Sequence, residues 1–474
     1  MRLGLLRATS LLTTTAVLTP NTLLAVSGIK LTLTQSCADD SCCSGDGQVH
    51  QGPPPAVPNT PASLQRDATI WTASIDQLQQ RFATWWDNYG FAHYPGTRVA
   101  LDKKPDDAKK EIRIRVLLES YERVVQPHPE HAGLTYLQFY HKQAQANLVR
   151  WAANFEAKYP AASAQREAML PSAKTTILLI EGDWGLGTSA LTKTFGKAFT
   201  VLNMANARVF GGGFKEGPAA QEENLFRRTD VGFTGKEVAF KQPDAGGKVE
   251  YTQEWNRAIN GMPGSDYYLP NTMRVCFRGP EQTTGSEFST RTPGYDFLPP
   301  QEVFPLYELR AAAENLKEHK IFNLKDAFQA YTTNAHNVKT SMFHRIRKQF
   351  AKATKSKKKY LVLSAFGAGA FNHPADEVAD LYFKQLMHDA AKFKGGVIAF
   401  VILGSAGYGY DNYSVFKSRF LAWAKRTEHK EMGASQWTFK VHDSVSDFQH
   451  GKPSTKLTQQ QEANINKFEQ AKMR

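Results

Sequence analysis

A continuous apolar run, Thr175-Thr-Ile-Leu-Leu-Ile180, ends in the turn Glu181-Gly-Asp-Trp-Gly185. Strands that are apolar throughout, rather than alternating, are typical of strands buried on both faces of a sheet. We therefore predict an α/β fold in which ligand loops follow the carboxyl ends of the strands. Further apolar runs of this kind lie at residues 199–202, 360–363 and 396–403, and helical patterns such as 375–394 separate them.

Composition changes along the chain indicate the remaining segments. Residues 1–28 resemble a signal peptide, because two arginines are followed by an uncharged stretch and by small residues before Gly28 that could form a cleavage site. Against this, threonines and Pro20 interrupt the apolar stretch. Both export and a cytoplasmic location therefore stay open. We predict a disordered linker over 29–62, a helical accessory region over 63–170, a ligand-binding α/β domain over 171–453 and a polar C-terminal tail over 454–474.

The charge balance points to acidic partners. The 474 residues include 58 Lys and Arg against 45 Asp and Glu, a formal net charge of +13. Such a balance favours polyanions without indicating any chemistry. A basic run over 344–359 contains no acidic residue and admits two interpretations: a solvated helix face, or a track for the phosphates of a long polymer, which salt dependence would reveal.

The four cysteines give no indication of a metal site. Cys37, Cys42 and Cys43 cluster without a usual zinc spacing, so incidental cysteines in a loose segment, or a disulfide within it, are the interpretations left open. Cys276 lies in the apolar run Arg274-Val-Cys-Phe-Arg278, which we predict to be a strand. We expect no metal and no cofactor, and no segment after the N-terminus is long and apolar enough to span a membrane.

The most informative stretch is Asn203-Met-Ala-Asn-Ala-Arg-Val-Phe-Gly-Gly-Gly-Phe-Lys-Glu-Gly-Pro-Ala-Ala-Gln-Glu-Glu223. Its three glycines allow the backbone to approach a ligand where a Cβ would collide. A helix starting after Gly217 would direct its free N–H groups at the same space, which suits a diphosphate. Adjacent carboxylates beside that site include a candidate general acid with a raised pKa. An ordinary acidic helix start is the alternative.

A second stretch, Leu363-Ser-Ala-Phe-Gly-Ala-Gly-Ala-Phe-Asn-His-Pro374, places two more glycines after a strand. This pattern is weak evidence alone, because it lacks the last glycine of a dinucleotide fingerprint and the chain has no P-loop. Two such loops in one α/β sheet, one of them followed by paired carboxylates, form a stronger combination.

Together these motifs resemble the signature of the bacterial-type poly(ADP-ribose) glycohydrolases, a branch of the macrodomain superfamily. The matching features are the triple glycine, the Gln-Glu-Glu seven residues later, the second glycine loop and the late element Asp411-Asn-Tyr-Ser-Val-Phe416, and Leu309-Arg-Ala-Ala-Ala313 matches less securely. The resemblance covers about 175–425 and implies a macrodomain-like glycohydrolase domain over 171–453, in which helices flank a mixed sheet. Phe210 stands where the family usually has proline, and Ala368 where it often has cysteine.

The resemblance implies that Glu223 is the catalytic acid, protonating the leaving ribose oxygen and then activating water. It implies that Glu222 binds a ribose hydroxyl and that Gln221 positions the loop. Because neighbouring helical residues point about 100° apart, Glu222 and Glu223 cannot flank one bond as in two-carboxylate glycosidases.

The remaining implied contacts are with substrate. Asn206 would bind the ribose bearing the scissile bond, Phe366 would hold that ribose, and Asp183 would contact the adenine amino group. Phe416 would stack on adenine, with Tyr413 as its competitor. The diphosphate would be wrapped by Gly211, Gly212, Gly213, Gly367, Ala368 and Gly369.

The resemblance therefore implies hydrolysis of ribose–ribose O-glycosidic bonds in poly(ADP-ribose), with release of ADP-ribose. Two alternatives stay open. One is a non-catalytic ADP-ribose-binding reader, against which the intact Gln-Glu-Glu argues. The other is a hydrolase that removes single ADP-ribose groups from ADP-ribosylated protein.

Overall fold

The structure is a computed structural model that describes residues 67–89, 108–233, 241, 250–282, 294–404, 410–428 and 436–473. The predicted signal peptide, the predicted linker and Cys37, Cys42 and Cys43 lie outside the described residues. The chain from Asn59 to Arg474 forms one compact unit.

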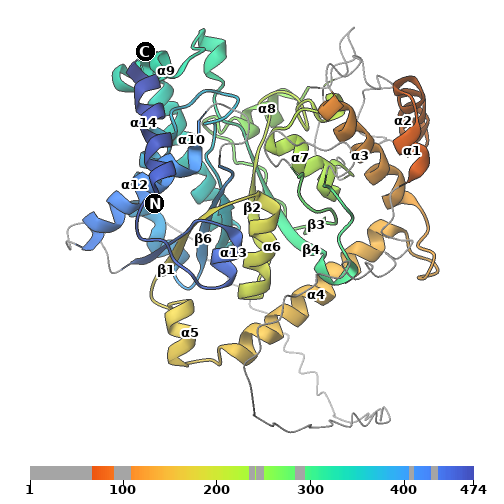
Figure 1. Cartoon of the computed structure of the whole chain (residues 1–474), viewed down its shortest axis with the longest axis horizontal. Helices are drawn as coiled ribbons and strands as arrows, with labels where there is room; N and C mark the ends of the chain where they lie inside the picture. Colours follow the sequence, from red (N-terminus) through yellow and green to blue (C-terminus); the bar gives the residue numbers. More distant parts are fainter. Residues whose placement is uncertain are drawn as a thin grey trace, which may run out of the picture. The chain divides into compact units, whose positions relative to one another are not determined.

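Within the described residues, one seven-stranded sheet lies at the centre of this unit, with the strand order β3-β4-β2-β5-β6-β1-β7 (Figure 1). Only β3 runs antiparallel to its neighbour, so the sheet is mixed, as predicted. The strands are β1 Thr175–Glu181, β2 Phe199–Met204, β3 Arg274–Cys276, β4 Phe304–Ala311, β5 Tyr360–Leu363, β6 Val397–Ile402 and β7 Trp437–His442.

Helices cover both faces of the sheet. Along β1, Ile177 and Leu179 enter one hydrophobic cluster, whereas Leu178 and Ile180 enter the other, and all four are at most 2% exposed. This alternation confirms that the apolar runs are strands buried on both faces. The helices are α1 Ala68–Thr72, α2 Ile75–Tyr89, α3 Ala108–Val125, α4 Tyr136–Lys158, α5 Ala164–Met169, α6 Trp184–Phe195, α7 Gln221–Arg228, α8 Gln253–Ile259, α9 Leu324–Thr333, α10 Val338–Lys355, α11 Ala375–Asp389, α12 Asn412–Glu428, α13 Val445–Gln449 and α14 Gln459–Met473.

The helices that cover the two faces of the sheet come from different parts of the chain. Residues of α9, α10, α11 and α12 pack on the first face, and residues of α3, α4, α6 and α7 pack on the second (Figure 1). The described part of 63–170 is helical, and its helices contact the α/β core directly: α3 contacts α7, and α4 contacts α6 and β4. The domain limits that we predict within the unit stay predictions.

The segment predicted as a polar C-terminal tail contains the helix α14. It contacts α9 and α12, and its Phe468 is 2% exposed within the first cluster. No helix of the described residues has the length and apolar character needed to cross a membrane.

The basic run over 344–359 forms the second half of α10 and the turn after it. Several of its cations are used internally. Arg345 is buried and donates to the Ala312 carbonyl at 2.8 Å, Lys348 donates to the Ser265 carbonyl, and the Lys358 ammonium lies over the Tyr307 ring. A track for polymer phosphates would therefore depend on the exposed remainder of the run, such as Arg347 and Lys357, and it stays a prediction.

Candidate active site

The two glycine-rich loops lie next to each other at one edge of the sheet. They follow β2 and β5, which pair in parallel, so their carboxyl ends meet at the same edge. Asn412, at the start of α12, approaches the second loop, because its side-chain amide donates to the Ala368 carbonyl at 3.4 Å. The structure thus brings together three of the motifs on which the resemblance rests.

The paired carboxylates occupy the first turn of α7 and point to different partners. Glu222 accepts from the backbone N–H groups of Asn206 at 2.6 Å and Gly211 at 3.1 Å. Glu223 accepts from the Gly213 N–H at 3.0 Å through Oε1, and its carboxyl also interacts with its own backbone N–H. Glu222 therefore braces the loop, while backbone N–H groups orient the Glu223 carboxyl.

Burial alters the acidity of both groups. Glu222 is 2% and Glu223 8% exposed. Burial raises the pKa of Glu222 to about 8, although the nearby Arg310 opposes this change. Burial likewise raises the pKa of Glu223, against the lowering effect of the Gly213 N–H. A carboxyl that stays protonated above its ordinary range is what a general acid requires.

Two of the three glycines are required by their close packing, Gly212 against Glu223 and Gly211 against aromatic rings. Gly211 and Gly212 have φ values of +76° and +56°, in the left-handed region. A Cβ on Gly212 would lie 2.4 Å from Glu223 Oε1, and one on Gly211 would lie 2.6 Å from the Phe214 and Phe226 rings. The loop backbone therefore packs directly against the Glu223 carboxyl and the aromatic core.

Two other residues of this stretch shape the loop. The Gln221 side chain bridges the end of β2, accepting from the Met204 N–H and donating to the Leu202 carbonyl. This geometry supports the positioning role that the resemblance implies for Gln221. The Asn206 Oδ1 accepts from the N–H groups of Arg208 and Val209, which forms a turn and leaves its NH2 group without a recorded partner among the described residues.

Arg310, at the end of β4, is a site residue for which the sequence assigned no role. Its guanidinium is 1% exposed, lies 3.6 Å from Glu222, pairs with Glu308 at 2.6 Å and donates to Tyr251. It also covers the Phe210 ring. An arginine within a buried strand pattern was the available signal, because a buried cation needs an anionic partner.

Asp183 lies at the start of α6 and has structural partners. Its Oδ1 accepts from the N–H groups of Gly185 and Leu186, which caps the helix. Both of its oxygens also accept from the buried Arg228 of α7, at 2.9 and 2.8 Å. Asp183 therefore ties the end of β1 to α7, and the adenine contact stays a prediction.

The second loop is fixed by His373. Its Nε2–H donates to the Glu314 carbonyl, and its Nδ1 accepts from the Tyr331 hydroxyl, both at 2.6 Å. Burial lowers the pKa of His373 to about 4, so the ring is neutral at neutral pH. Gly367 has a φ of +77°, and a Cβ there would meet His373 at 2.6 Å, whereas Gly369 has nothing within 4 Å and faces open space.

The aromatic residues expected at the ribose and adenine are in the core. Phe366 and Phe416 are 0% exposed and belong to the first hydrophobic cluster. Tyr413 is also 0% exposed and donates to Asp443 at 2.8 Å. Neither phenylalanine presents a ring face to solvent in this structure, so contact with substrate requires these rings to become accessible, and their stacking roles stay predictions.

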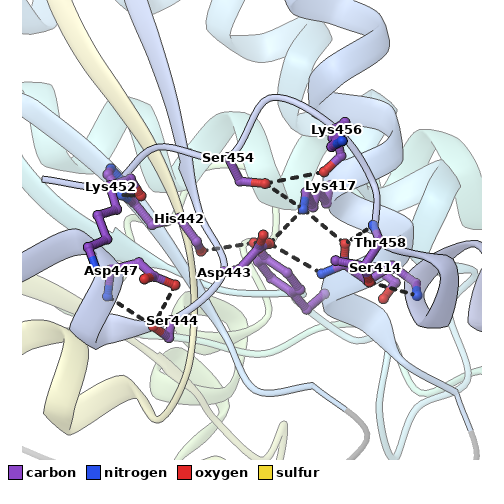
Figure 2. Close-up of polar contacts among 12 residues, drawn as sticks. Ser414, Lys417, His442, Asp443, Ser444, Asp447, Lys452, Ser454, Lys456 and Thr458 are labelled. Carbon is purple, nitrogen blue, oxygen red and sulfur yellow. Dashed lines mark hydrogen bonds and ion pairs between the residues drawn. The ribbon is translucent and has the colours of Figure 1, made fainter. Parts of the chain in front are cut away.

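The C-terminal segment is fastened to α12 beside this part of the site. Figure 2 shows Lys417 of α12 facing Asp443 and Ser454, and its ammonium donates to these two residues and to Gln461 at 2.6–2.9 Å. Lys417 is 0% exposed. We call these four residues the C-terminal anchor.

The described residues contain no group of three or more His, Cys, Asp or Glu side chains arranged to hold a metal ion. Cys276 of β3 is free and buried, and burial raises the pKa of its thiol to about 12. The polar groups of the site are instead suited to sugar hydroxyls and a diphosphate, which backbone N–H groups and carboxylates bind.

Comparison with known proteins bears on this site. A family model, "Microbial-type PARG, catalytic domain" (PARG is poly(ADP-ribose) glycohydrolase), matches residues 135–234. The solved PARG of Thermomonospora curvata is 19% identical to this chain and has a TM-score of 0.39. The match covers 65% of this chain and 98% of the Thermomonospora chain. The PARG of Deinococcus radiodurans in complex with ADP-ribose is 19% identical, covers 60% and 93%, and has a TM-score of 0.36. No curated protein matches.

The matched segment includes both carboxylates and the triple glycine, so the resemblance found in the sequence is confirmed. Residues 135–234 of this chain are thus similar to the catalytic domain of microbial-type PARG.

Proposed function

We propose that this protein hydrolyses the ribose–ribose O-glycosidic bonds of poly(ADP-ribose) and releases ADP-ribose, with Glu223 as general acid and then general base. The observation that carries the residue assignment is the environment of Glu223. Its carboxyl is buried, burial raises its pKa, and the backbone N–H groups of Gly213 and of Glu223 itself orient it.

The reaction follows from this arrangement. The protonated Oε2 of Glu223 donates its proton to the oxygen of the leaving ribose as the bond from that oxygen to the anomeric carbon breaks. Positive charge develops on the sugar ring, and a water molecule attacks the anomeric carbon and gives its proton to the Glu223 carboxylate. Glu222 acts beside this step by bracing the Asn206–Gly211 backbone.

Substrate binding would use both loops. The N–H groups of the triple glycine and the open surface at Gly369 suit the diphosphate, and the unpaired NH2 group of Asn206 suits a ribose hydroxyl. The net charge of +13 favours a polyanionic partner. Binding of poly(ADP-ribose) through the exposed part of the basic run belongs to the same proposal.

The test is release of ADP-ribose from poly(ADP-ribose) by the wild type and by Glu223→Gln. We expect the substitution to lower the rate by about 10²–10⁴, because the amide cannot transfer a proton, while ADP-ribose binding measured by calorimetry persists. Glu216→Gln, an exposed acid on the same loop, is the matched control and should retain activity.

The same assay followed over pH tests the protonation state. Since the raised pKa of Glu223 keeps it protonated above its ordinary value of 4.5, wild-type kcat should fall only as pH rises through that raised pKa. A decline centred near 4.5 would contradict the assignment. Binding of ADP-ribose without polymer cleavage would favour a reader or a hydrolase of single protein-linked groups.

A further inference from the structure

The helix α3 precedes the segment that matches the family model, yet it packs against the catalytic helix. It contacts α7 and the short 3-10 turn Phe214–Glu216, called η2. The approach is close, because a Cβ on Gly217 would lie 2.4 Å from the Lys110 carbonyl oxygen of α3. The loop between the triple glycine and α7 therefore rests on the backbone of α3.

Arg113 of α3 makes the polar contacts at this junction. It is 7% exposed, and its Nη1 donates to the Gly217 carbonyl at 3.1 Å. Its Nε and Nη2 donate to Glu281 Oε1 at 3.0 and 2.8 Å. One guanidinium thus bridges the loop before α7 and the segment that carries Glu281.

Glu281 is in turn linked to α7 through the Tyr295 hydroxyl. Its Oε2 accepts from the Tyr295 hydroxyl at 2.7 Å, and that hydroxyl accepts from Asn224 at 2.9 Å and from Arg227 at 3.3 Å. Asn224 directly follows Glu223 in the first half of α7. Arg113 is therefore linked directly to Gly217 and, through Glu281 and Tyr295, to Asn224.

The other link runs through η2. Gly217 ends this turn, and Gly213 begins it. The Glu216 N–H donates to the Gly213 carbonyl at 2.7 Å, and the Gly213 N–H donates to Glu223. A shift of the Gly217 carbonyl therefore changes the donor that orients the Glu223 carboxyl.

We propose that α3 positions the catalytic helix, with Arg113 as a positioning residue that fixes the Gly213–Glu223 segment and thereby the carboxyl of Glu223. This inference rests on the proposed function for its kinetic consequence. It assigns a role in catalysis to a helix outside the matched segment. The positioning role depends on the planar guanidinium, whose several N–H groups donate in fixed directions to two acceptors at once. A single ammonium group cannot do this.

The test compares Arg113→Lys with Arg115→Lys. Lysine retains the positive charge beside Glu281. Its single ammonium group cannot reproduce the three hydrogen bonds that the arginine donates to Glu281 and to the Gly217 carbonyl. Arg115 is a matched control on the same helix: it is 8% exposed and binds Glu111 and the Ile70 carbonyl, away from the loop. We expect Arg113→Lys to lower kcat by about 10- to 100-fold, as small misplacements of catalytic groups do, and Arg115→Lys to change it less than about twofold.

Hydrogen exchange provides a readout that needs no activity. In Arg113→Lys the amides of Phe214 and Glu216, which close η2, should exchange on the order of tenfold faster, and in Arg115→Lys they should not. Tyr295→Phe, which removes only the hydroxyl, should lower kcat in the same direction. Equal kcat and equal exchange in Arg113→Lys and Arg115→Lys would overturn the proposal. A wild type that releases no ADP-ribose would overturn the proposed function instead, and the exchange comparison would still decide the positioning role.

Discussion

At the scale of single residues, Gly212 lies close to the carboxyl of Glu223, the acid that we propose. We expect Gly212→Ala to lower ADP-ribose release by at least about 100-fold, because its Cβ would lie 2.4 Å from Glu223 Oε1 and displace the carboxyl. The polymer assay measures this directly.

The matched control is Gly264→Ala. Gly264 has a φ of +78°, and a Cβ there would meet nothing within 4 Å. Both variants bear the left-handed strain of roughly 1–2 kcal/mol, which urea unfolding would show, but only Gly212→Ala should lose activity. Similar activity in the two would mean that the loop tolerates a displaced Glu223.

At the scale of elements, the C-terminal anchor joins α12 to β7 and α14 (Figure 2). We expect Lys417→Met to destabilise the fold by about 1.5–3 kcal/mol, because it removes charge-assisted hydrogen bonds to the partly exposed Asp443 and to Ser454 and Gln461. Urea unfolding of this variant and of Lys425→Met, an exposed lysine on the same helix, measures the difference. Equal midpoints would show that the ammonium is not needed for docking of the C-terminal segment.

The same anchor bears on the site, because α12 begins with Asn412, which approaches the Ala368 carbonyl. Loosening α12 should therefore weaken ADP-ribose binding as well as stability. The residues that the sequence presents as a polar tail thus pack on α12, the helix whose first residue approaches the Ala368 carbonyl.

At the scale of the whole molecule, the N-terminal helices complete the core on one face of the sheet. Leu117, Leu118 and Tyr121 of α3 are at most 1% exposed and share a cluster with Leu225 and Phe226 of α7. Each buried side chain of this size contributes about 1.5–3 kcal/mol, against a typical total stability of 5–15 kcal/mol.

We therefore expect a chain covering 127–474 to aggregate or to unfold without cooperativity. A chain covering 59–474, which contains the whole compact unit, should unfold cooperatively. Solubility and thermal unfolding monitored by circular dichroism measure this. A soluble, active 127–474 chain would show that α1–α3 are dispensable, contrary to this account.

Much of the fold could be predicted from local signals. The run 175–180 became β1, residues 199–202 became β2, and the helical pattern over 375–394 became α11 and the turn after it. The strand predictions hold because a strand buried on both faces of a sheet needs an uninterrupted run of apolar, often β-branched residues. The helix prediction holds because apolar residues recur every three or four positions along a helix. The family assignment succeeded for a related reason: the triple glycine and Gln-Glu-Glu are close in sequence, and a backbone loop packed against a carboxyl permits no Cβ.

The remaining features were decided only by the tertiary structure. Arg113 meets Glu281 across 168 residues, and Asp183 meets Arg228 across 45, so no local pattern specifies either pair. The burial of Phe366 and Phe416 depends on which helices cover the sheet. The sequence by itself determined the strands and the glycine loops and proposed Glu223 as the acid, because each depends on neighbouring residues. Chain topology decided which distant cations and aromatic rings surround them, because those contacts form only when the elements pack.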